Sequence, residues 1–389
     1  MEAAQRISPT ARGNERLTDP FRLGYSPSLD GLRGVAILVV MGFNGHLLWL
    51  RGGFIGVDIF FVLSGFLITA LLVQAYDPTS GIGLKNFYFR RALRLLPALF
   101  ALMLFCAAYA LLFQPTDKAN TTFEGILFTL FYVANWAQVP PFPGGIGALS
   151  HAWSLSVEEQ FYIIWPLMLL VLLKLQSKTL VFLILGLLIG SSILLNIWFW
   201  HAEAPYLRMY FGTDTRANEI LIGCVAALAL SWGFLKPTDR LKWAFHTGSI
   251  ASLVGIVLSF FLVRHYGAFV YNGGFTLISI GTAIVIVDLL LFPSRLSRIF
   301  EFAPLVWIGK ISYGLYLWHF PVFEASRRLF EGRISPVFYE VAGVVVTLMV
   351  ATASYYFLEQ PFLKLARRYK TNDSTGNMLP VSTRTAESV

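Results

Sequence analysis

Arg33, Asn44 and His46 are polar side chains in the first long apolar run of the sequence, which begins after Asp30. On a helix that rises 1.5 Å per residue, Asn44 and His46 would lie about 16–20 Å beyond Arg33, at or past mid-membrane. Ionisable groups at such depth are costly and usually face a functional cavity. Asn44 and His46 cannot share a helix face, because two residues turn a helix by about 200°. The run therefore predicts that Arg33, and one of the two polar groups deeper in the membrane, face a functional cavity. Snorkelling of Arg33 and an interhelical hydrogen bond are the structural alternatives.

A basic block formed by Arg90, Arg91 and Arg94 stands at the start of a later apolar run. Positions 90 and 94 are one helical turn apart, and Arg91 lies beside them. The planar guanidinium group suits phosphate oxygens, so the block predicts a clamp for a nucleotide phosphate. Attraction to anionic lipid headgroups is the alternative. Lys310, near another apolar run, is a further candidate for the same ligand.

Carboxylates and aromatic residues gather at the starts of further apolar runs. Glu158 and Glu159 follow His151 closely and could act as acid and base, or could stabilise the positive end of a helix. Asp58 opens the second run, where Asp30 or Asp58 could orient a catalytic base. Ion pairs between helices, aromatic belts and a structural histidine are the alternatives for the remaining candidates. These remaining candidates, which we expect to line a substrate-binding site, are Trp153, Tyr162, Asp214, Arg216, Tyr313 and His319.

The composition decides which elements must position these residues. Of the 389 residues, 56 % are hydrophobic and 13 % are charged, and the mean hydropathy is +0.64, whereas soluble domains average about 25 % charged. Most of the chain must therefore lie in lipid. The excess of 30 Lys and Arg over 22 Asp and Glu is expected of basic cytoplasmic loops and gives no reason to invoke nucleic acid. Cys106 and Cys224 both lie in apolar runs, so we expect no disulfide.

The apolar runs predict an all-α polytopic membrane protein with about ten transmembrane helices and both termini cytoplasmic. A run at about 122–138 is doubtful because Glu124 and Asn135 interrupt it. Arg327, Arg328 and Arg333 count against this topology, because it places them outside. From Thr371 onward the polar composition predicts a disordered tail. The predicted spans are 34–50, 54–74, 95–113, 157–175, 179–200, 217–234, 245–263, 270–292, 304–324 and 336–358.

Seven segments, in this order, resemble the blocks of the acyltransferase-3 family of membrane acyltransferases. The resemblance covers about residues 26–363, between a cytoplasmic segment at 1–25 and a basic, then disordered, tail at 364–389. It implies about ten spans in the inner (plasma) membrane and transfer of an acyl group, usually acetyl, from acyl-CoA to hydroxyls of glycans, peptidoglycan or macrolides. No metal is expected. The blocks are LDGLRG, GVDIFFVLSGFLI, FxRRxxRLxP, WSLSVEEQFY, DTRANEILIG, ISYGLYLWH and LEQP.

The sequence departs from the family pattern in its first span. There the family has an arginine followed, after ten intervening residues, by a histidine regarded as catalytic, and counting from Arg33 reaches Asn44. An amide cannot act as a general base, so either the base has been lost, naturally or by engineering, or His46 replaces it. The helix rotation argues against His46. A transporter and a non-catalytic membrane protein of the same fold are the rival hypotheses. The resemblance implies that Arg33, Arg90, Arg91, Arg94 and Lys310 hold acyl-CoA, and that the catalytic group is drawn from Asn44, His46, Asp30, Arg33, Glu158 and Glu159.

Overall fold

The computed structural model describes residues 21–46, 49–79, 81–140 and 146–366, so most of the predicted segments 1–25 and 364–389 lies outside the described residues. The predicted all-α class is confirmed: within these ranges there is no strand, only an isolated bridge between Asp77 and Gly81. The helices are α1 Pro27–Asn44, α2 Gly56–Ala75, α3 Leu84–Phe113, α4 Thr116–Leu130, α5 Ala152–Lys174, α6 Lys178–His201, α7 Tyr206–Phe211, α8 Thr213–Ser231, α9 Asp239–Leu262, α10 Phe275–Leu291, α11 Arg295–Phe300, α12 Ala303–Lys310, α13 Ser312–Phe330 and α14 Pro336–Ser354.

Seven helices in the described part of the chain are long and apolar enough to cross a membrane. They are α2, α3, α5, α6, α9, α10 and α14. Adjoining helical turns lengthen α2, α10 and α14. Two of the other predicted spans correspond to α1 and α8, which have 18 and 19 residues. The third, 304–324, is not one helix, because it is divided between α12 and α13 at Ile311. The count of ten stays a prediction. The doubtful run at 122–138 lies partly in α4, which has 15 residues and measures about 22 Å, less than the roughly 30 Å of a bilayer core.

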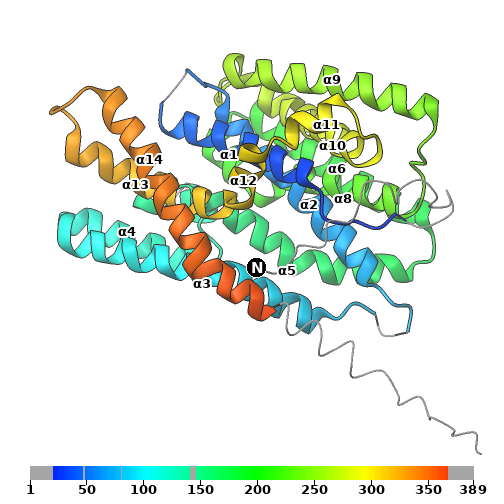
Figure 1. Cartoon of the computed structure of the whole chain (residues 1–389), viewed down its shortest axis with the longest axis horizontal. Helices are drawn as coiled ribbons and strands as arrows, with labels where there is room; N and C mark the ends of the chain where they lie inside the picture. The colour runs from blue at the N-terminus through cyan, green and yellow to red at the C-terminus, as the bar shows by residue number, and fades with distance from the viewer. Residues whose placement is uncertain (1–20, 47–48, 80, 141–145, 367–389) are drawn as a thin grey trace, which may run out of the picture.

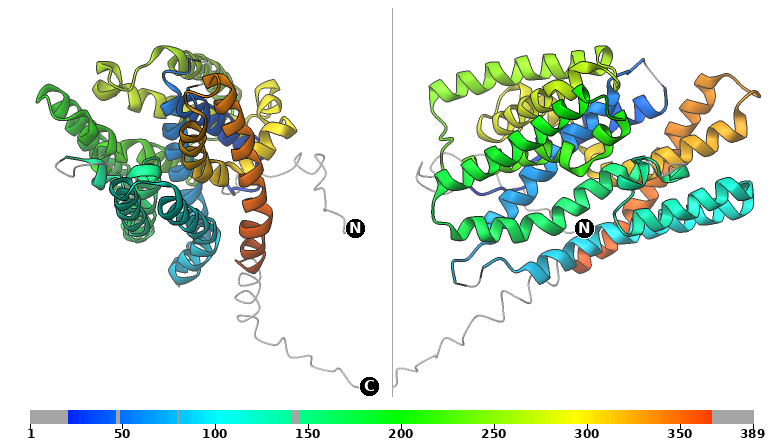
Figure 2. Two further views of the ribbon diagram at one scale, coloured as in Figure 1. Left: turned by 90° about the vertical axis from the view of Figure 1, so that its left-hand side faces the viewer. Right: turned by 180° about the vertical axis from the view of Figure 1, so that it is seen from behind.

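The long helices run roughly side by side, and their connections fall at two opposite ends of the bundle (Figures 1 and 2). The α2–α3, α5–α6 and α8–α9 connections lie at one end, and the α13–α14 turn lies at the other. The first end carries the exposed Lys174, Lys178 and Lys236, as expected of a cytoplasmic face. At the opposite end, Arg327 pairs with Glu340 and Arg328 with Glu324, at 2.7 and 2.8 Å.

The centre of the bundle is held by close contact between main chains. A Cβ atom on Gly65 of α2 would collide with the carbonyl group of Ile220, and one on Gly223 of α8 would collide with that of Val62. Glycine at these two positions therefore lets the α2 and α8 backbones touch, which is how small residues promote helix packing in membranes.

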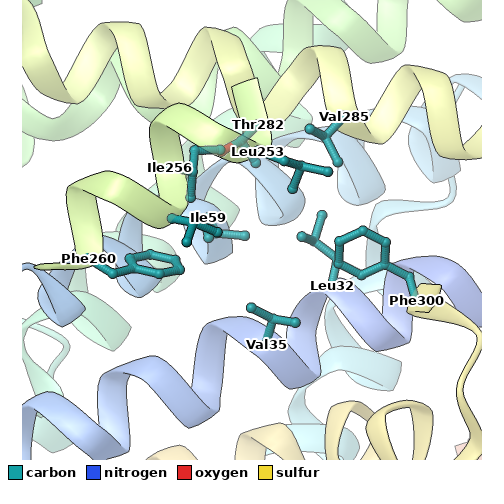
Figure 3. Close-up of a pocket in the computed structure, with 10 residues that line it drawn as sticks. Leu32, Val35, Ile59, Leu253, Ile256, Phe260, Thr282, Val285 and Phe300 are labelled. Atoms are coloured by element: carbon teal, nitrogen blue, oxygen red, sulfur yellow. The ribbon is translucent and has the colours of Figure 1, made fainter. Parts of the chain in front are cut away.

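A small void of about 30 Å³ lies among α1, α2, α9, α10 and α11 (Figure 3). Leu32, Ile59, Phe260 and Phe300 point toward it, and Thr282 contributes a hydroxyl-bearing side chain to an otherwise apolar wall. This volume is about that of one water molecule. None of the ionisable candidates lines it, so the site for chemistry lies elsewhere.

Candidate active site

A larger cavity, of about 290 Å³, is enclosed by α1, α2, α3, α5 and α13. Its wall on α2 extends from Val57 to Leu71, which is about 21 Å along the helix at 1.5 Å per residue. It is therefore elongated and runs along much of the depth of the bundle. We call it the arginine cavity. Its polar lining residues are Arg33, Ser64, Arg91, Arg94, Ser154, Glu158, Glu159, Tyr162, Ser312, Tyr313 and Tyr316.

Three of the predicted arginines meet in this cavity although they come from two separate segments. Arg33 on α1 donates to the hydroxyl of Ser312 at 3.0 Å. Arg91 on α3 donates to both oxygens of Glu159, at 3.2 and 2.5 Å, and its guanidinium lies over the Tyr162 ring. Arg94, one turn further along α3, is exposed and lines the cavity. Its guanidinium has no side-chain hydrogen bond or ion pair within the described residues, so it is available to an anionic ligand.

Two of the predicted donor-binding residues lie outside the cavity wall. Arg90 is next to Arg91 and one turn before Arg94 on α3, but it does not line the cavity. Lys310, at the end of α12, is exposed, and its ammonium group lies 5.4 Å from the centre of the Tyr25 ring. Asp30 at the start of α1 is likewise not part of the wall.

The carboxylates of the cavity come from two adjacent positions of α5. Glu158 accepts a hydrogen bond from the Ser64 hydroxyl of α2 at 3.1 Å, and Glu159 is held by Arg91. Ser154, Glu158 and Tyr162 are spaced at four residues and therefore line one face of the helix. The wall thus combines three guanidinium groups with two carboxyl groups, and one of the carboxyl groups already neutralises Arg91.

Tyr316 closes the end of the cavity farthest from Leu71. Its hydroxyl donates to the His151 carbonyl at 2.7 Å and lies 2.5 Å from the Ser154 hydroxyl. One turn beyond Tyr316 on α13 is His319, which is fully buried. Nε2 of His319 lies 3.1 Å from the side-chain nitrogen of Asn44. The structure thus brings together two candidates, Asn44 and His319, that are 275 residues apart.

His46 is not placed with this pair. Helix α1 ends at Asn44, and His46 follows it as an exposed residue with φ of 50° in the loop. Asn44 and His46 are therefore separated by the end of the helix as well as by helix rotation. This placement agrees with the rotation argument against His46 as a substitute for position 44.

A second cluster of ionisable side chains is separate from the arginine cavity. Arg216 lies 2.8 Å from Asp58 and 3.2 Å from Glu219, and all three side chains have no exposed surface. We call these three residues the sealed cluster. Aromatic rings surround the guanidinium, with the Phe275 centre at 3.8 Å and the Trp153 centre at 5.6 Å. Trp153 and Arg216, both predicted to contact the acceptor, therefore form part of the protein interior.

Asp214 is also apart from the cavity. Both of its carboxylate oxygens accept hydrogen bonds from Arg208, at 2.8 and 2.5 Å, and this pair is partly exposed. The interhelical ion pair that was the alternative for this segment is thus what the structure contains, since Arg208 lies in α7 and Asp214 in α8.

Residues 26–356 match the family model described as an acyltransferase domain, acyltransferase-3. The chain belongs to the acyltransferase-3 family. It is 38 % identical over 352 residues to the peptidoglycan O-acetyltransferase OatA of Listeria monocytogenes, covering 87 % of this chain and 56 % of the relative. It is 37 % identical over 351 residues to the putative peptidoglycan O-acetyltransferase YrhL of Bacillus subtilis, covering 87 % and 55 %.

A putative O-acetyltransferase of Staphylococcus aureus is 36 % identical over 354 residues, covering 88 % of this chain and 58 % of the relative. The chain thus spans a little over half the length of the curated relatives that it matches. No solved structure matches it. Together with its seven span-length apolar helices, membership of the acyltransferase-3 family makes the chain a multi-pass membrane protein.

The acyltransferase-3 site includes residues that the sequence analysis did not single out. Ser64, Ser154, Ser312 and Tyr316 supply hydroxyl groups to the cavity, and each lies within a segment that resembles a family block. Glu359 of the closing LEQP block is buried, and its Oε1 has no hydrogen-bond partner. A Cβ atom on Gly314 would lie 3.2 Å from that oxygen. The signal available in the sequence was a carboxylate within an apolar helix, at the point where α14 continues as a π-helical turn.

Proposed function

We propose that this acyltransferase-3 protein is a membrane O-acyltransferase that moves an acetyl or similar acyl group from acyl-CoA to a hydroxyl of a glycan. Family membership and the printed names of the relatives, which describe O-acetyltransferases of peptidoglycan, support this reaction class. Those names favour peptidoglycan over a hydrophobic alcohol such as a macrolide. They also favour a location in the cytoplasmic (inner) membrane of a bacterium, from which peptidoglycan is reached on the outer side.

The observation that carries the proposal is the pair of guanidinium groups, on Arg33 and Arg94, that line the arginine cavity and form no direct ion pair with a carboxylate of the described residues. Arg33 has only the Ser312 hydroxyl, and Arg94 has no side-chain partner among the described residues. Arginine binds phosphate oxygens through its planar fork. The residues present therefore fit the phosphates of a CoA thioester, and the 21 Å length of the wall leads from them toward Tyr316. A transporter would not require this phosphate-binding chemistry.

The transfer step needs a proton acceptor. The thioester carbon–sulfur bond breaks and a carbon–oxygen ester bond forms, while the acceptor hydroxyl loses its proton and the thiolate of CoA gains one. A neutral imidazole can carry that proton, whereas the Asn44 amide cannot. We therefore propose that Asn44 occupies the place of the family's catalytic histidine and that this chain binds its donor with impaired turnover.

Acetyl-CoA binding and a restored base test the proposal separately. Acetyl-CoA at about 100 times its dissociation constant should stabilise the purified protein by roughly 2.7 kcal/mol, measured as a rise in thermal transition. Asn44→His should then increase CoA release from acetyl-CoA in the presence of a soluble peptidoglycan fragment. Acetyl-CoA that leaves the transition unchanged contradicts the donor assignment. Binding without any gain from Asn44→His contradicts the role of position 44.

A further inference from the structure

The tautomer of His319 is fixed by the helix that carries it. Its Nδ1 lies 2.7 Å from the Tyr316 carbonyl oxygen and 3.2 Å from that of Leu315. A carbonyl oxygen can only accept a hydrogen bond, so Nδ1 must carry a proton. In a neutral imidazole the other nitrogen then carries a lone pair. Nε2 of His319 is therefore an acceptor, and it points at the side chain of position 44.

The side chain at position 44 must accordingly be a donor. The Asn44 amide nitrogen meets this requirement, because one of its hydrogens can go to His319 Nε2 at 3.1 Å and the other to the Val40 carbonyl at 3.2 Å. The backbone here is also fixed: Arg327 donates to the Asn44 carbonyl oxygen and, at 2.7 Å, to Glu340. Position 44 is thus held against α13 and α14 by two independent contacts.

We propose that His319 is the positioning residue for the side chain at position 44, accepting a hydrogen bond that turns this side chain toward the reacting groups. The inference rests on the proposed function. An imidazole at position 44 would donate one N–H to His319 Nε2, which would leave the lone pair of its other nitrogen free to take the proton of the acceptor hydroxyl. That proton would pass to the departing thiolate, so the pair ends the cycle unchanged. A base oriented through its second nitrogen is a recurrent arrangement in acyl transfer.

His319 itself is unsuited to be the base. Its side chain has no exposed surface, and its lone pair is already used by position 44. Neither His319 nor Asn44 is among the residues that line the arginine cavity. Asn44, by contrast, is only partly buried. The geometry therefore points to different tasks for the two positions: the less buried position 44 takes the proton, and His319 acts through it.

An activity test compares variants of the full chain in the Asn44→His background. Adding His319→Ala should lower kcat for acetyl-CoA by about tenfold or more while KM changes by less than about twofold, as when an outer partner of a functional histidine is removed. Adding His319→Gln should recover most of the loss, because the amide oxygen can accept in place of Nε2. His201→Gln is the matched control, since His201 is exposed at the end of α6. Full activity with His319→Ala overturns the inference and leaves the proposed function standing.

A second measurement needs no activity. Nitrogen-15 NMR of the unmodified chain labelled at its six histidines, with the His319 signal assigned from its loss in His319→Gln, should show a protonated Nδ1 and an unprotonated Nε2. Asn44→Ala should shift the Nε2 resonance. A protonated Nε2, or a resonance indifferent to Asn44→Ala, overturns the inference. If the Asn44→His variant binds acetyl-CoA but releases no CoA, the proposed role of position 44 is contradicted. The NMR result then decides by itself whether His319 orients the side chain at that position.

Discussion

The arginine cavity and the sealed cluster contain the same kinds of residue but differ in access. The cavity combines Arg33, Arg91 and Arg94 with two glutamates around an elongated space of about 290 Å³. The sealed cluster combines Arg216 with Asp58 and Glu219, and none of the three has exposed surface. One group can therefore meet a ligand, whereas the other can meet only protein. An ionisable residue inside a membrane protein indicates function only when space adjoins it.

The energetic roles of the two groups differ for the same reason. In the sealed cluster a single guanidinium faces two carboxyl groups, so removing Arg216 leaves buried carboxyl groups without their cation. In the arginine cavity Arg94 forms no direct ion pair within the described residues and acts on the buried Glu359 only through its charge, so its removal should cost less stability than that of Arg216. Substitutions should thus affect stability in the sealed cluster and ligand binding in the cavity.

The largest effect should come from Arg216→Met. It leaves Asp58 and Glu219 buried without their cation, which typically costs about 3–5 kcal/mol. The thermal transition of the purified protein should fall steeply, or folded protein should fail to accumulate. Arg208→Met is the control, because the Arg208–Asp214 pair is partly exposed and pairs of that kind contribute about 1 kcal/mol or less. Equal effects of the two changes would contradict the contrast.

Arg94→Ala should weaken acetyl-CoA binding and spare stability. Loss of a hydrogen bond to a charged group costs roughly 1.5–3 kcal/mol, which corresponds to a dissociation constant raised about tenfold or more. Isothermal titration calorimetry on the purified chain measures this. Arg90→Ala is the matched control, since Arg90 neighbours the cavity residues on α3 but does not line the cavity. If both substitutions weaken binding alike, the block attracts anions only through its overall charge.

Glu159→Gln should strengthen acetyl-CoA binding by a smaller factor. It removes the carboxylate that neutralises Arg91 and so raises the positive charge of the cavity, an effect of about 1 kcal/mol at separations of some 15 Å in a medium of effective dielectric constant 20. The same calorimetric titration gives the answer. Weaker binding would indicate that Glu159 is needed to hold Arg91 in place.

The smallest effect should come from Glu324→Gln. Glu324 pairs with Arg328 one turn along α13, and both side chains are 31 % exposed, so the change should cost less than about 0.5 kcal/mol. The thermal transition should barely move. A drop comparable with that of Arg216→Met would show that partial exposure does not distinguish the ion pairs of this protein.

The sequence predicted the class of fold and most of the cavity charges for clear physical reasons. Long apolar runs have few options other than helices in a bilayer, and arginines one turn apart on one helix share a face. It could not separate Arg90 from Arg94, because membership of the cavity wall depends on how α3 is rotated against α1 and α5. Nor could it place Trp153 against Arg216 of the sealed cluster and its neighbour Ser154 in the cavity wall, because this also depends on how α5 is rotated against the other helices.

The pairing of Asn44 with His319 was beyond the sequence for a different reason. Both residues were candidates, but most of the chain separates α1 from α13 in the sequence, and no local pattern links the two residues. Position 44 was recognised by its distance from Arg33 along one helix, whereas its partner is fixed by packing between two helices. The sequence could thus indicate which residues matter without indicating which act together.

The glycine contacts between α2 and α8 bear on which acyl chains the cavity can take. Because Gly65 and Gly223 bring the main chains of α2 and α8 into contact, α2 cannot move away from the cavity through a change of side-chain rotamer between these helices. Space for a longer acyl chain would have to come from the facing wall, where Leu95 of α3 and Tyr313 of α13 line the cavity. The Tyr313 hydroxyl donates a hydrogen bond to the Leu95 carbonyl there. Selectivity for the length of the acyl group is therefore expected to reside in α3 and α13, and smaller side chains there should admit longer donors.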